Sequence, residues 1–168
     1  MKYQGSYCAL ITPFKDDIFD EKSFIKIIEW HIKQGTQGIV PCGTTGESPT
    51  LSHDEHKKVV ELAVETSGGR LQVIAGTGSN STKEAVSLTK HAKQCGADSA
   101  LVVVPYYNKP SQEGLKKHFL KIADTVDLPI FIYNIPGRSV VDMSNETIEK
   151  LSEHENIIGI KDASNDLS

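Results

Sequence analysis

Lys161 is the residue whose type and surroundings point most directly to chemistry. It follows the apolar run Asn156–Ile160 (NIIGI). Apolar neighbours withdraw water from an amine and favour its neutral form, which is the form that attacks a ketone carbon to give an imine. The alternative is a lysine whose stem extends from the end of a strand into solvent. The context of Lys161 therefore indicates covalent amine chemistry without establishing it.

Two further candidates end or follow the apolar run Pro129–Tyr133 (PIFIY). Tyr133 has the same strand parity as Phe131, so both side chains are expected on one face of a strand. A phenol beside a reactive lysine can move protons, although a core tyrosine with a hydrogen-bonded hydroxyl is the commoner role. Arg138 ends the turn-rich segment Asn134–Arg138 and can hold a carboxylate with two hydrogen bonds. A solvated loop arginine is the alternative.

Two glycine-flanked segments are candidate ligand-binding loops. Gly43–Glu47 (GTTGE) can present backbone amides and the hydroxyls of Thr44 and Thr45 to a carboxylate. It is not a phosphate-binding P-loop, because no Lys-Ser/Thr pair follows at the required spacing. Gly76–Gly78 (GTG) matches only half of a dinucleotide-binding fingerprint, since Ser81 takes the place of the third glycine. These patterns favour carboxylate recognition over nucleotide binding.

Composition and charge exclude several classes of function. The net charge is −4 over 168 residues and no basic run exceeds two residues, so no nucleic-acid or membrane-surface partner is expected. Cys8, Cys42 and Cys95 have neither disulfide-framework nor zinc spacing. His53 and His56 can share a helix face but lack an apparent third ligand, so no metal site is expected. A poor signal sequence and the lack of a long apolar run favour a cytoplasmic location.

Short apolar runs alternate along the chain with longer amphipathic segments. The expected strands are Tyr7–Thr12, Gly38–Pro41, Leu71–Ala75, Ser99–Val104, Pro129–Tyr133 and Asn156–Ile160. The expected helices are Glu21–Gln34 after the cap Asp20, a helix from the capping box Ser52-x-x-Glu55 towards Thr66, one from Ser81-x-x-Glu84 to near Cys95, Gln112–Asp124 and Asn145–Glu153. Strands that alternate with helices predict an α/β fold with a parallel sheet.

Two architectures satisfy this alternation, a doubly wound sheet and a (β/α)₈ barrel. The candidate functional residues all follow strands, and in a barrel these strand ends meet on one face. In a doubly wound sheet the same residues spread along an edge. The clustering therefore favours the barrel. A barrel of this kind needs two more strands and is usually about 250 residues long, so residues 1–168 are expected to form a single catalytic barrel domain that is incomplete at its C-terminus, with about six βα units.

Five segments of the chain, in order, resemble the dihydrodipicolinate synthase family of the pyruvate-dependent class I aldolase superfamily. They are Gly43–Ser48 (GTTGES), Val73–Gly78 (VIAGTG), Pro105–Pro110 (PYYNKP), Tyr133–Arg138 (YNIPGR) and Ile158–Ser164 (IGIKDAS). The resemblance runs from about Gly5 to the last residue. It implies a (β/α)₈ barrel enzyme, a lyase that condenses pyruvate with L-aspartate 4-semialdehyde in lysine and diaminopimelate biosynthesis.

The resemblance also implies a role for each matching residue. Lys161 forms the imine with pyruvate, and Tyr133, Thr45 and Tyr107 form a proton relay. Thr44 and Thr45 position the pyruvate carboxylate, and Arg138 binds the carboxylate of the semialdehyde. In this family the tyrosine at the position of Tyr107 comes from a neighbouring subunit, which implies a homodimer or homotetramer. Lys161 acts as the covalent catalyst through its imine with pyruvate, so neither a cofactor nor a metal is implied.

Two alternatives to this function remain open. N-acetylneuraminate lyase and keto-sugar-acid aldolases share the lysine and tyrosine, but the combination of Thr45 and Arg138 resembles the synthase more closely. The other alternative is an inactive, truncated α/β module, which is disfavoured because Lys161, Tyr133 and Tyr107 are all present with those two residues.

A regulatory site is implied as well. In family members inhibited by L-lysine, the effector binds at a dimer interface, which makes allosteric feedback inhibition an expectation for the complete enzyme. The matching residues in this chain are Ser48, His53, His56, Asn80, Glu84 and Tyr106. Pro49 directly follows Ser48, and a proline at this position is expected to alter the loop.

Overall fold

The computed structural model describes residues 3–165 and divides the chain into two compact units. The first comprises Met1–Gly76 with Gln94–Asp98, and the second comprises Thr77–Lys93 with Ser99–Ser168. In both units, parallel strands alternate with helices along the chain. The α/β class expected from the sequence therefore holds within each unit.

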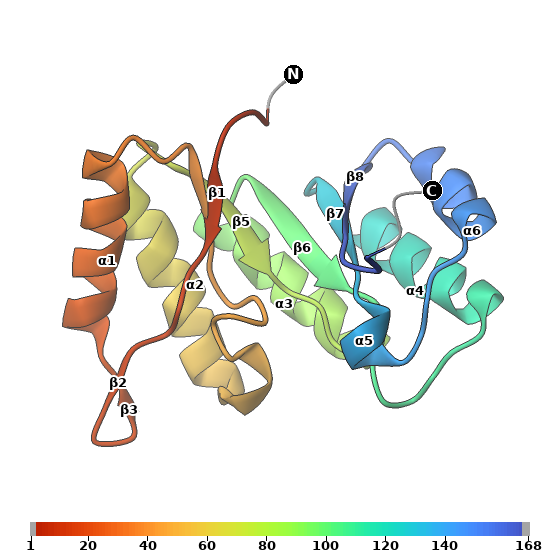
Figure 1. Ribbon diagram of the computed structural model, residues 1–168, viewed down its shortest axis with the longest axis horizontal. Coiled ribbons are helices and arrows are strands. Elements are labelled where there is room, and N and C mark those ends of the chain that lie inside the picture. Colours follow the sequence, from red (N-terminus) through yellow and green to blue (C-terminus); the bar gives the residue numbers. More distant parts are fainter. Residues whose placement is uncertain (1–2, 166–168) are drawn as a thin grey trace. The chain divides into compact units, whose positions relative to one another are not determined.

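The first unit contains three parallel strands in the order β1-β4-β5 among its described residues. The helices α1 and α2 pack against each other (Figure 1). Its elements are β1 (Tyr7–Ala9), β2 (Phe14–Lys15), β3 (Ile18–Phe19), α1 (Glu21–Lys33), β4 (Gly38–Val40), the 3₁₀ turn η1 (Ser48–Thr50), α2 (His53–Ser67) and β5 (Gln72–Gly76).

Local capping chemistry sets the ends of the first unit's helices. Asp20 caps α1 by accepting a hydrogen bond from the Ser23 amide, and Ser52 and Glu55 form a reciprocal capping box at the start of α2. Gly35, with φ +73°, follows α1, and Gly68, with φ +52°, ends α2, as left-handed glycines commonly do. These helix ends agree with the sequence prediction to within one residue.

A small hairpin of β2 and β3 was not predicted. Its turn residues, Asp16 and Asp17, both have positive φ, of 52° and 60°. Two-residue hairpin turns of type I′ need such a backbone at both positions, and aspartate tolerates it better than most residues. The paired aspartates were the local signal for this turn.

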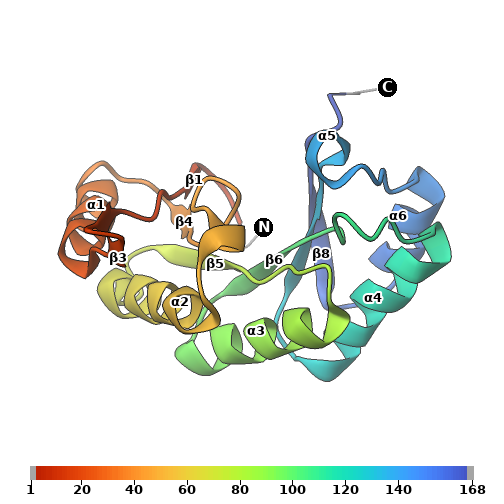
Figure 2. The ribbon, with the colours of Figure 1, turned by 90° about the horizontal axis from the view of Figure 1, so that it is seen from below.

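The second unit has three parallel strands in the order β6-β7-β8 among its described residues. Helices α4 and α6 lie side by side, and α5 lies beyond the carboxyl end of β7 (Figures 1 and 2). The elements are α3 (Thr82–Cys95, whose last two residues belong to the first unit), β6 (Ser99–Val103), α4 (Gln112–Thr125), β7 (Ile130–Asn134), α5 (Pro136–Ser139), α6 (Asn145–Ser152) and β8 (Ile157–Asp162).

The core of the second unit lies between its strands and helices. Ile130 and Ile132 of β7 and Val102 of β6 are fully buried or nearly so, as are Phe119 of α4 and Leu151 of α6. Strands covered by helices bury apolar side chains in continuous runs, which is why these segments read as apolar in the sequence. This packing holds the carboxyl ends of β6, β7 and β8 along one edge.

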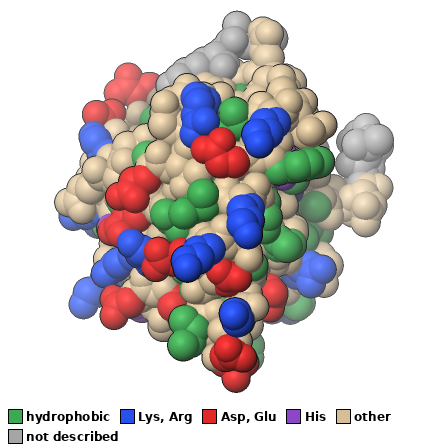
Figure 3. Space-filling model, turned by 90° about the vertical axis from the view of Figure 1, so that its left-hand side faces the viewer, with side chains coloured by type: hydrophobic (Ala, Val, Ile, Leu, Met, Phe, Trp, Pro, Cys, Tyr) green, Lys and Arg blue, Asp and Glu red, His purple; other side chains and the backbone are tan. Residues whose placement is uncertain are grey.

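One face of the described residues has mixed charge. On the side that carries α1, acidic and basic side chains are intermingled, with hydrophobic side chains between them (Figure 3). Among residues 3–165, no helix combines the length and the apolar character needed to span a bilayer.

Candidate active site

The carboxyl ends of β7 and β8 bring together the two residues with the strongest chemical signal. The strands are parallel, and their register pairs Tyr133 with Lys161 and Asn134 with Asp162. The Nζ atom of Lys161 lies over the Tyr133 ring, 4.1 Å from its centroid. The negative face of an aromatic ring attracts positive charge at this distance. Tyr133 is only 6% exposed, so its ring is a packed platform beneath an exposed lysine.

The prediction that apolar side chains surround Lys161 is wrong for the described residues. Lys161 is exposed, and its neighbours Ile158 and Ile160 are 41% and 38% exposed. The reason is the position of β8 in the sheet, because it pairs with β7 and with no other described strand. An apolar run in the sequence predicts a strand, but it cannot predict how many neighbours cover that strand.

One face of the β7–β8 pair carries both the catalytic candidates and an aromatic neighbour. Phe131 and Tyr133 lie two residues apart, as do their register partners Gly159 and Lys161, so alternation places all four on one face. A β-carbon at Gly159 would lie 2.7 Å from Cε1 of Phe131. The Phe131 ring therefore occupies the space beside Gly159, and the Tyr133 ring occupies the next position along the strand.

Arg138 lies in a single helical turn where the sequence predicted a turn-rich loop. This turn, α5, begins with Pro136, and its C-cap Val140 has a left-handed backbone with φ +63°. The Oγ atom of Ser139 lies 2.9 Å from the carbonyl oxygens of both Ile135 and Val141 and ties the turn together. Arg138 itself is exposed. Its guanidinium is thus held just beyond the end of β7, where it is accessible to an anionic ligand.

Tyr107 follows β6 and projects into solvent. Its side chain is 93% exposed, and its φ of +70° is unusual for a residue other than glycine. The neighbouring Asn108 bonds through its amide to the Tyr106 carbonyl, at 2.8 Å, and through its side chain to the Asn80 carbonyl, at 3.1 Å. These bonds fix the loop that presents Tyr107.

Thr44 and Thr45 lie in the first unit, in a tight turn after β4, and both are exposed. The amide of Gly46 donates to the Gly43 carbonyl, at 3.1 Å. The hydroxyl of Thr12 donates to the Gly46 carbonyl, at 2.7 Å, and is buried. The turn is therefore fastened to the segment that follows β1.

Two residues with a supporting role were missed by sequence reasoning. Thr12 was expected only as the end of a strand, and Asn134 only as part of a turn-rich segment. Both are almost fully buried, at 4% and 2% exposed, although both are polar. A buried polar side chain must find hydrogen-bond partners, and these partners lie far away in sequence. The only signal was their position within or beside the motifs.

The residues of the expected lysine site are divided between the two units. In the first unit, Ser48 begins η1 and is half-buried, and His53 begins α2 and is exposed. His56 is buried, at 4% exposed, and its carbonyl accepts a hydrogen bond from the thiol of Cys42. The two histidines lie three residues apart on α2, and the structure exposes the first and buries the second.

In the second unit, Asn80 and Tyr106 lie in loops that are linked to each other, and Glu84 lies in the first turn of α3. Asn80 is linked to the Tyr106–Asn108 segment through the side chain of Asn108. The Glu84 carboxylate accepts a hydrogen bond from the hydroxyl of Ser79, and the Glu84 amide donates to Ser81 Oγ at 3.5 Å. Tyr106 is half-buried.

The arrangement of these motifs corresponds to a known family. Residues 2–168 match the model of the Dihydrodipicolinate synthetase family. The chain belongs to this family. The resemblance of its five segments is thereby confirmed.

Named relatives support the same assignment. The chain is 60% identical over 166 residues to the 4-hydroxy-tetrahydrodipicolinate synthase of Parvibaculum lavamentivorans, covering 99% of this chain and 57% of the relative. The solved dihydrodipicolinate synthase of Acinetobacter baumannii complexed with pyruvate is 55% identical with a TM-score of 0.95, over 98% of this chain and 57% of that one. The enzyme of Cyanidioschyzon merolae with lysine bound is 41% identical with a TM-score of 0.93, over 97% of this chain and 57% of that one.

These likenesses decide between the two architectures that fit the sequence. A TM-score of 0.96 over 98% of the chain to a dihydrodipicolinate synthase confirms the barrel-type α/β fold, here with about six βα units. The chain spans about half the length of the curated relatives that it matches, 57% of one and 56% of another.

Proposed function

We propose that this chain carries the Schiff-base centre of a 4-hydroxy-tetrahydrodipicolinate synthase, which condenses pyruvate with L-aspartate 4-semialdehyde. One observation carries the proposal: the amine of Lys161 lies over the buried ring of Tyr133, at the carboxyl ends of paired strands. Active sites of barrel enzymes lie at that end of the strands. The names of the family's members supply the reaction.

The chemistry begins at Nζ of Lys161. The neutral amine attacks C2 of pyruvate, and the carbonyl oxygen leaves as water, giving an imine. Loss of a proton from the pyruvate methyl group gives an enamine, whose carbon then attacks the aldehyde of the second substrate. The amino group of that substrate then attacks the imine carbon, which closes the ring and releases Nζ of Lys161 as the free amine. The protonated imine carries positive charge at Nζ, and the Tyr133 ring face favours that charge.

Other residues move protons and hold carboxylates in this proposal. The phenol of Tyr133, the hydroxyl of Thr45 and the phenol of Tyr107 pass protons between the substrates and solvent. Thr44 and Thr45 bind the pyruvate carboxylate, and the exposed guanidinium of Arg138 binds that of the semialdehyde in bidentate geometry. The covalent imine acts as the electron sink, so we propose that the reaction uses no separate cofactor or metal.

Tyr107 acts in a partner copy of the chain under this proposal. Its side chain is 93% exposed on a loop fixed by hydrogen bonds, which suits a residue that reaches into a neighbouring subunit. The working enzyme is therefore proposed to be a homodimer or homotetramer. Its substrates are small soluble metabolites, and we propose that it works in the cytoplasm.

A related pyruvate-dependent aldolase is the alternative enzyme. N-acetylneuraminate lyase and keto-sugar-acid aldolases would use the same lysine and tyrosine but would bind a sugar acid. The pair Thr45 and Arg138 favours a short substrate with a carboxylate. Consumption of pyruvate with the semialdehyde but not with sugars supports the synthase, and the reverse preference supports the alternative.

We also propose that L-lysine inhibits the complete enzyme. The relative from Cyanidioschyzon merolae was solved with lysine bound, and imidazole and carboxylate groups such as those of His53 and Glu84 suit the polar ends of an amino acid. The site would also draw on Ser48, Asn80 and Tyr106. The burial of His56 makes a direct contact with the ligand less favourable for that residue.

The test of the function is to trap the imine. Intact mass is measured after adding pyruvate and borohydride to the chain and to its Lys161→Ala variant, with Lys150→Ala as a matched control. Lys150 is exposed and pairs with Glu146 on α6. An adduct on the parent and on the Lys150 variant, but not on the Lys161 variant, supports the proposal. An adduct that survives loss of Lys161 contradicts it, and an inert parent chain favours the inactive-module alternative.

A further inference from the structure

Asn134, directly after Tyr133, links two acidic residues on either side of it. It is only 2% exposed. Its side-chain nitrogen lies 2.8 Å from Oδ1 of Asp142 and 3.3 Å from Oδ1 of Asp162. An amide nitrogen carries two hydrogens, so it can donate one to each carboxylate. Hydrogen bonds to ionised acceptors are stronger than neutral ones.

The remaining polar groups of Asn134 are bonded as well. The side-chain oxygen accepts from the Met143 amide at 3.2 Å, and the backbone carbonyl accepts from the Ala163 amide at 2.9 Å. Asn134 therefore binds both residues that directly follow Lys161, Asp162 through its side chain and Ala163 through its backbone. Together these bonds tie the end of β7 to the end of β8.

Asp162 in turn shapes the segment after Lys161. Its Oδ1 atom accepts from the Ser164 amide at 3.1 Å, and its Oδ2 atom accepts from the Ser164 hydroxyl at 3.0 Å. A carboxylate bonded to an amide two residues later closes a local turn. The backbone that leaves Lys161 is thus held from Asn134 on one side and by its own turn on the other.

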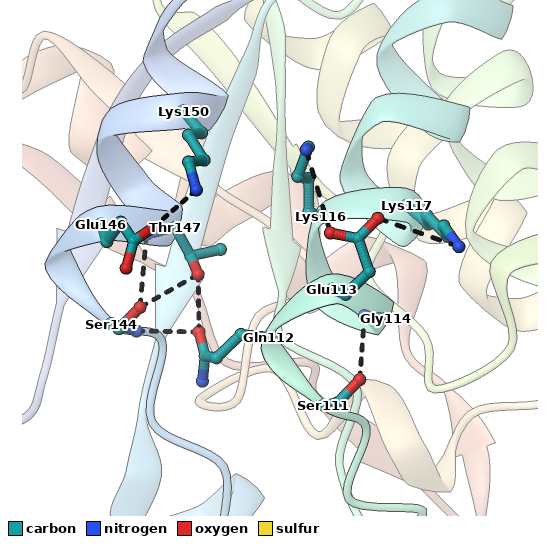
Figure 4. Close-up of polar contacts among 10 residues, drawn as sticks. All are labelled: Ser111, Gln112, Glu113, Gly114, Lys116, Lys117, Ser144, Glu146, Thr147 and Lys150. Atoms are coloured by element: carbon teal, nitrogen blue, oxygen red, sulfur yellow. Dashed lines mark hydrogen bonds and ion pairs between the residues drawn. The ribbon is translucent and has the colours of Figure 1, made fainter.

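Asp142, the other partner, is anchored to the helices of the second unit. The side-chain nitrogen of Gln112 donates to the Asp142 carbonyl at 2.8 Å. The side-chain oxygen of Gln112 accepts from the Ser144 amide, at 3.0 Å, and from the Thr147 hydroxyl, at 2.8 Å (Figure 4). The chain of bonds from Asp162 thus ends on the first turns of α4 and α6.

We propose that Asn134 is a positioning residue for the reactive amine: by bridging Asp142 and Asp162 it fixes the end of β8 so that Lys161 lies over Tyr133. The inference rests on the proposed Schiff-base function. Lys161 is exposed and its amine lies over the Tyr133 ring, so the backbone of β8 sets where that amine can lie. A misplacement of about 1 Å at a reacting atom costs roughly 100-fold in rate.

The test uses a nearly isosteric change with two matched rescues. Asn134→Asp keeps the shape of the side chain and removes both hydrogen bonds that it donates. It also places a third carboxylate between those of Asp142 and Asp162. Adding Asp162→Asn restores an amide–carboxylate pair at β8, whereas adding Asp142→Asn restores one at the α4–α6 side. The two double variants have the same net charge, so they differ only in which side of Asn134 regains its bond. The single variant Asp162→Asn is a further control, because its side-chain oxygen can still accept from Asn134.

The readouts are the rate of borohydride-trapped imine formation and the melting temperature. Asn134→Asp is expected to slow imine formation by about 10- to 100-fold. Both double variants are expected to regain thermal stability, but only the one containing Asp162→Asn is expected to regain the rate. Equal recovery of the rate in both, or an unchanged rate in Asn134→Asp, overturns the positioning role.

Hydrogen exchange separates this inference from the proposed function. The Ala163 amide, bonded to the Asn134 carbonyl, is expected to exchange faster in Asn134→Asp and to regain protection with Asp162→Asn, whether or not pyruvate reacts. If the parent chain forms no adduct, the function fails while exchange at Ala163 still decides the inference. Unchanged exchange in Asn134→Asp overturns it.

Discussion

The ring of Phe131 occupies the space that a side chain at Gly159 would need. A β-carbon built on Gly159 lies 2.7 Å from one ring carbon of Phe131 and 2.8 Å from another. The strand register shifts next to this pair, between Ile130 and Phe131, which leaves Ile158 without a partner. A bulge of this kind re-aims the residues that follow it, and Lys161 is one of them.

Gly159→Ala is therefore expected to destabilise the fold. Overpacking of a filled site typically costs about 1–3 kcal/mol, and this change should lower the free energy of unfolding in urea by that amount. Phe131→Leu in the same chain removes the ring edge and should recover most of the loss. If Gly159→Ala has the same stability as the parent, the ring does not confine this position.

Tyr133→Phe and Tyr133→Leu separate the phenol from the ring. The first keeps the aromatic face under Lys161 and removes the hydroxyl, so it tests proton transfer, which typically contributes about 10²–10⁴-fold to a rate. The second also removes the face that attracts positive charge. Imine trapping is expected to slow in the first variant and to slow further in the second. A Tyr133→Phe variant that matches the parent would remove the phenol from the proton relay.

Val140 is expected to be a point of backbone strain. It is β-branched, has φ +63° and is 69% exposed, so its conformation costs energy with little packing in return. Residues held in such a conformation cost about 1–3 kcal/mol, and asparagine adopts it more readily. Val140→Asn should raise the free energy of unfolding by about 1 kcal/mol. In Val140→Ala the free energy of unfolding should rise less, because alanine adopts a left-handed backbone less readily than asparagine. A loss of stability in Val140→Asn would contradict the strain.

His118 should make stability depend on pH. It is buried on α4, its Nδ1 atom lies 2.9 Å from the Thr82 hydroxyl, and burial lowers its pKa to about 4 from an ordinary 6.5. Between these values the unfolded chain binds more protons than the folded one, so stability falls as pH falls from 6.5 towards 4. The full loss is on the order of 3 kcal/mol.

Denaturant unfolding of the parent and of His118→Asn across pH 4 to 7 measures this contribution. Asparagine keeps a polar atom near Thr82 and does not titrate. The variant should lose less stability than the parent between pH 6.5 and 4. If the free energies of unfolding of the two proteins change with pH in parallel, His118 is protonated as readily in the folded chain as in the unfolded one.

Lysine inhibition is checked on the complete enzyme by titrating L-lysine against the condensation. Inhibition at millimolar concentrations is expected, and His53→Ala should weaken it because His53 is an exposed residue of the expected lysine site. His31→Ala, a histidine outside the expected site, is the control. Full activity at millimolar lysine would remove the regulatory proposal without affecting the catalytic one.

Local patterns predicted most of the fold because their causes are local. The Ser52–Glu55 capping box and the left-handed Gly68 act within one helical turn, and the structure places the ends of α2 where they predict. The Asp16–Asp17 hairpin was also local, but its strands are two residues long and carry no alternating pattern. Short elements of this kind are decided by turn conformation more than by hydrophobicity.

The sequence named candidate residues for the site, but it did not predict their exposure or their hydrogen-bond partners. The motifs named Lys161 and Tyr133, and period-two alternation placed Tyr133 beside Phe131. The exposure of Lys161 depends on the number of strands beside β8, and the roles of Asn134 and Thr12 depend on partners distant in sequence. Such tertiary relationships leave no periodic trace in a single chain.

The bridge at Asn134 is also a site where deamidation would change the protein. Asparagine is among the thermolabile residues, and hydrolysis of its amide would place a carboxylate between those of Asp142 and Asp162. This is the electrostatic change that Asn134→Asp makes deliberately. Burial at 2% exposed limits the access of water to the amide, and the β-branched Ile135 that follows hinders attack of its backbone nitrogen on the amide carbon. Deamidation of Asn134 would therefore make the same change as Asn134→Asp, and its burial slows that change.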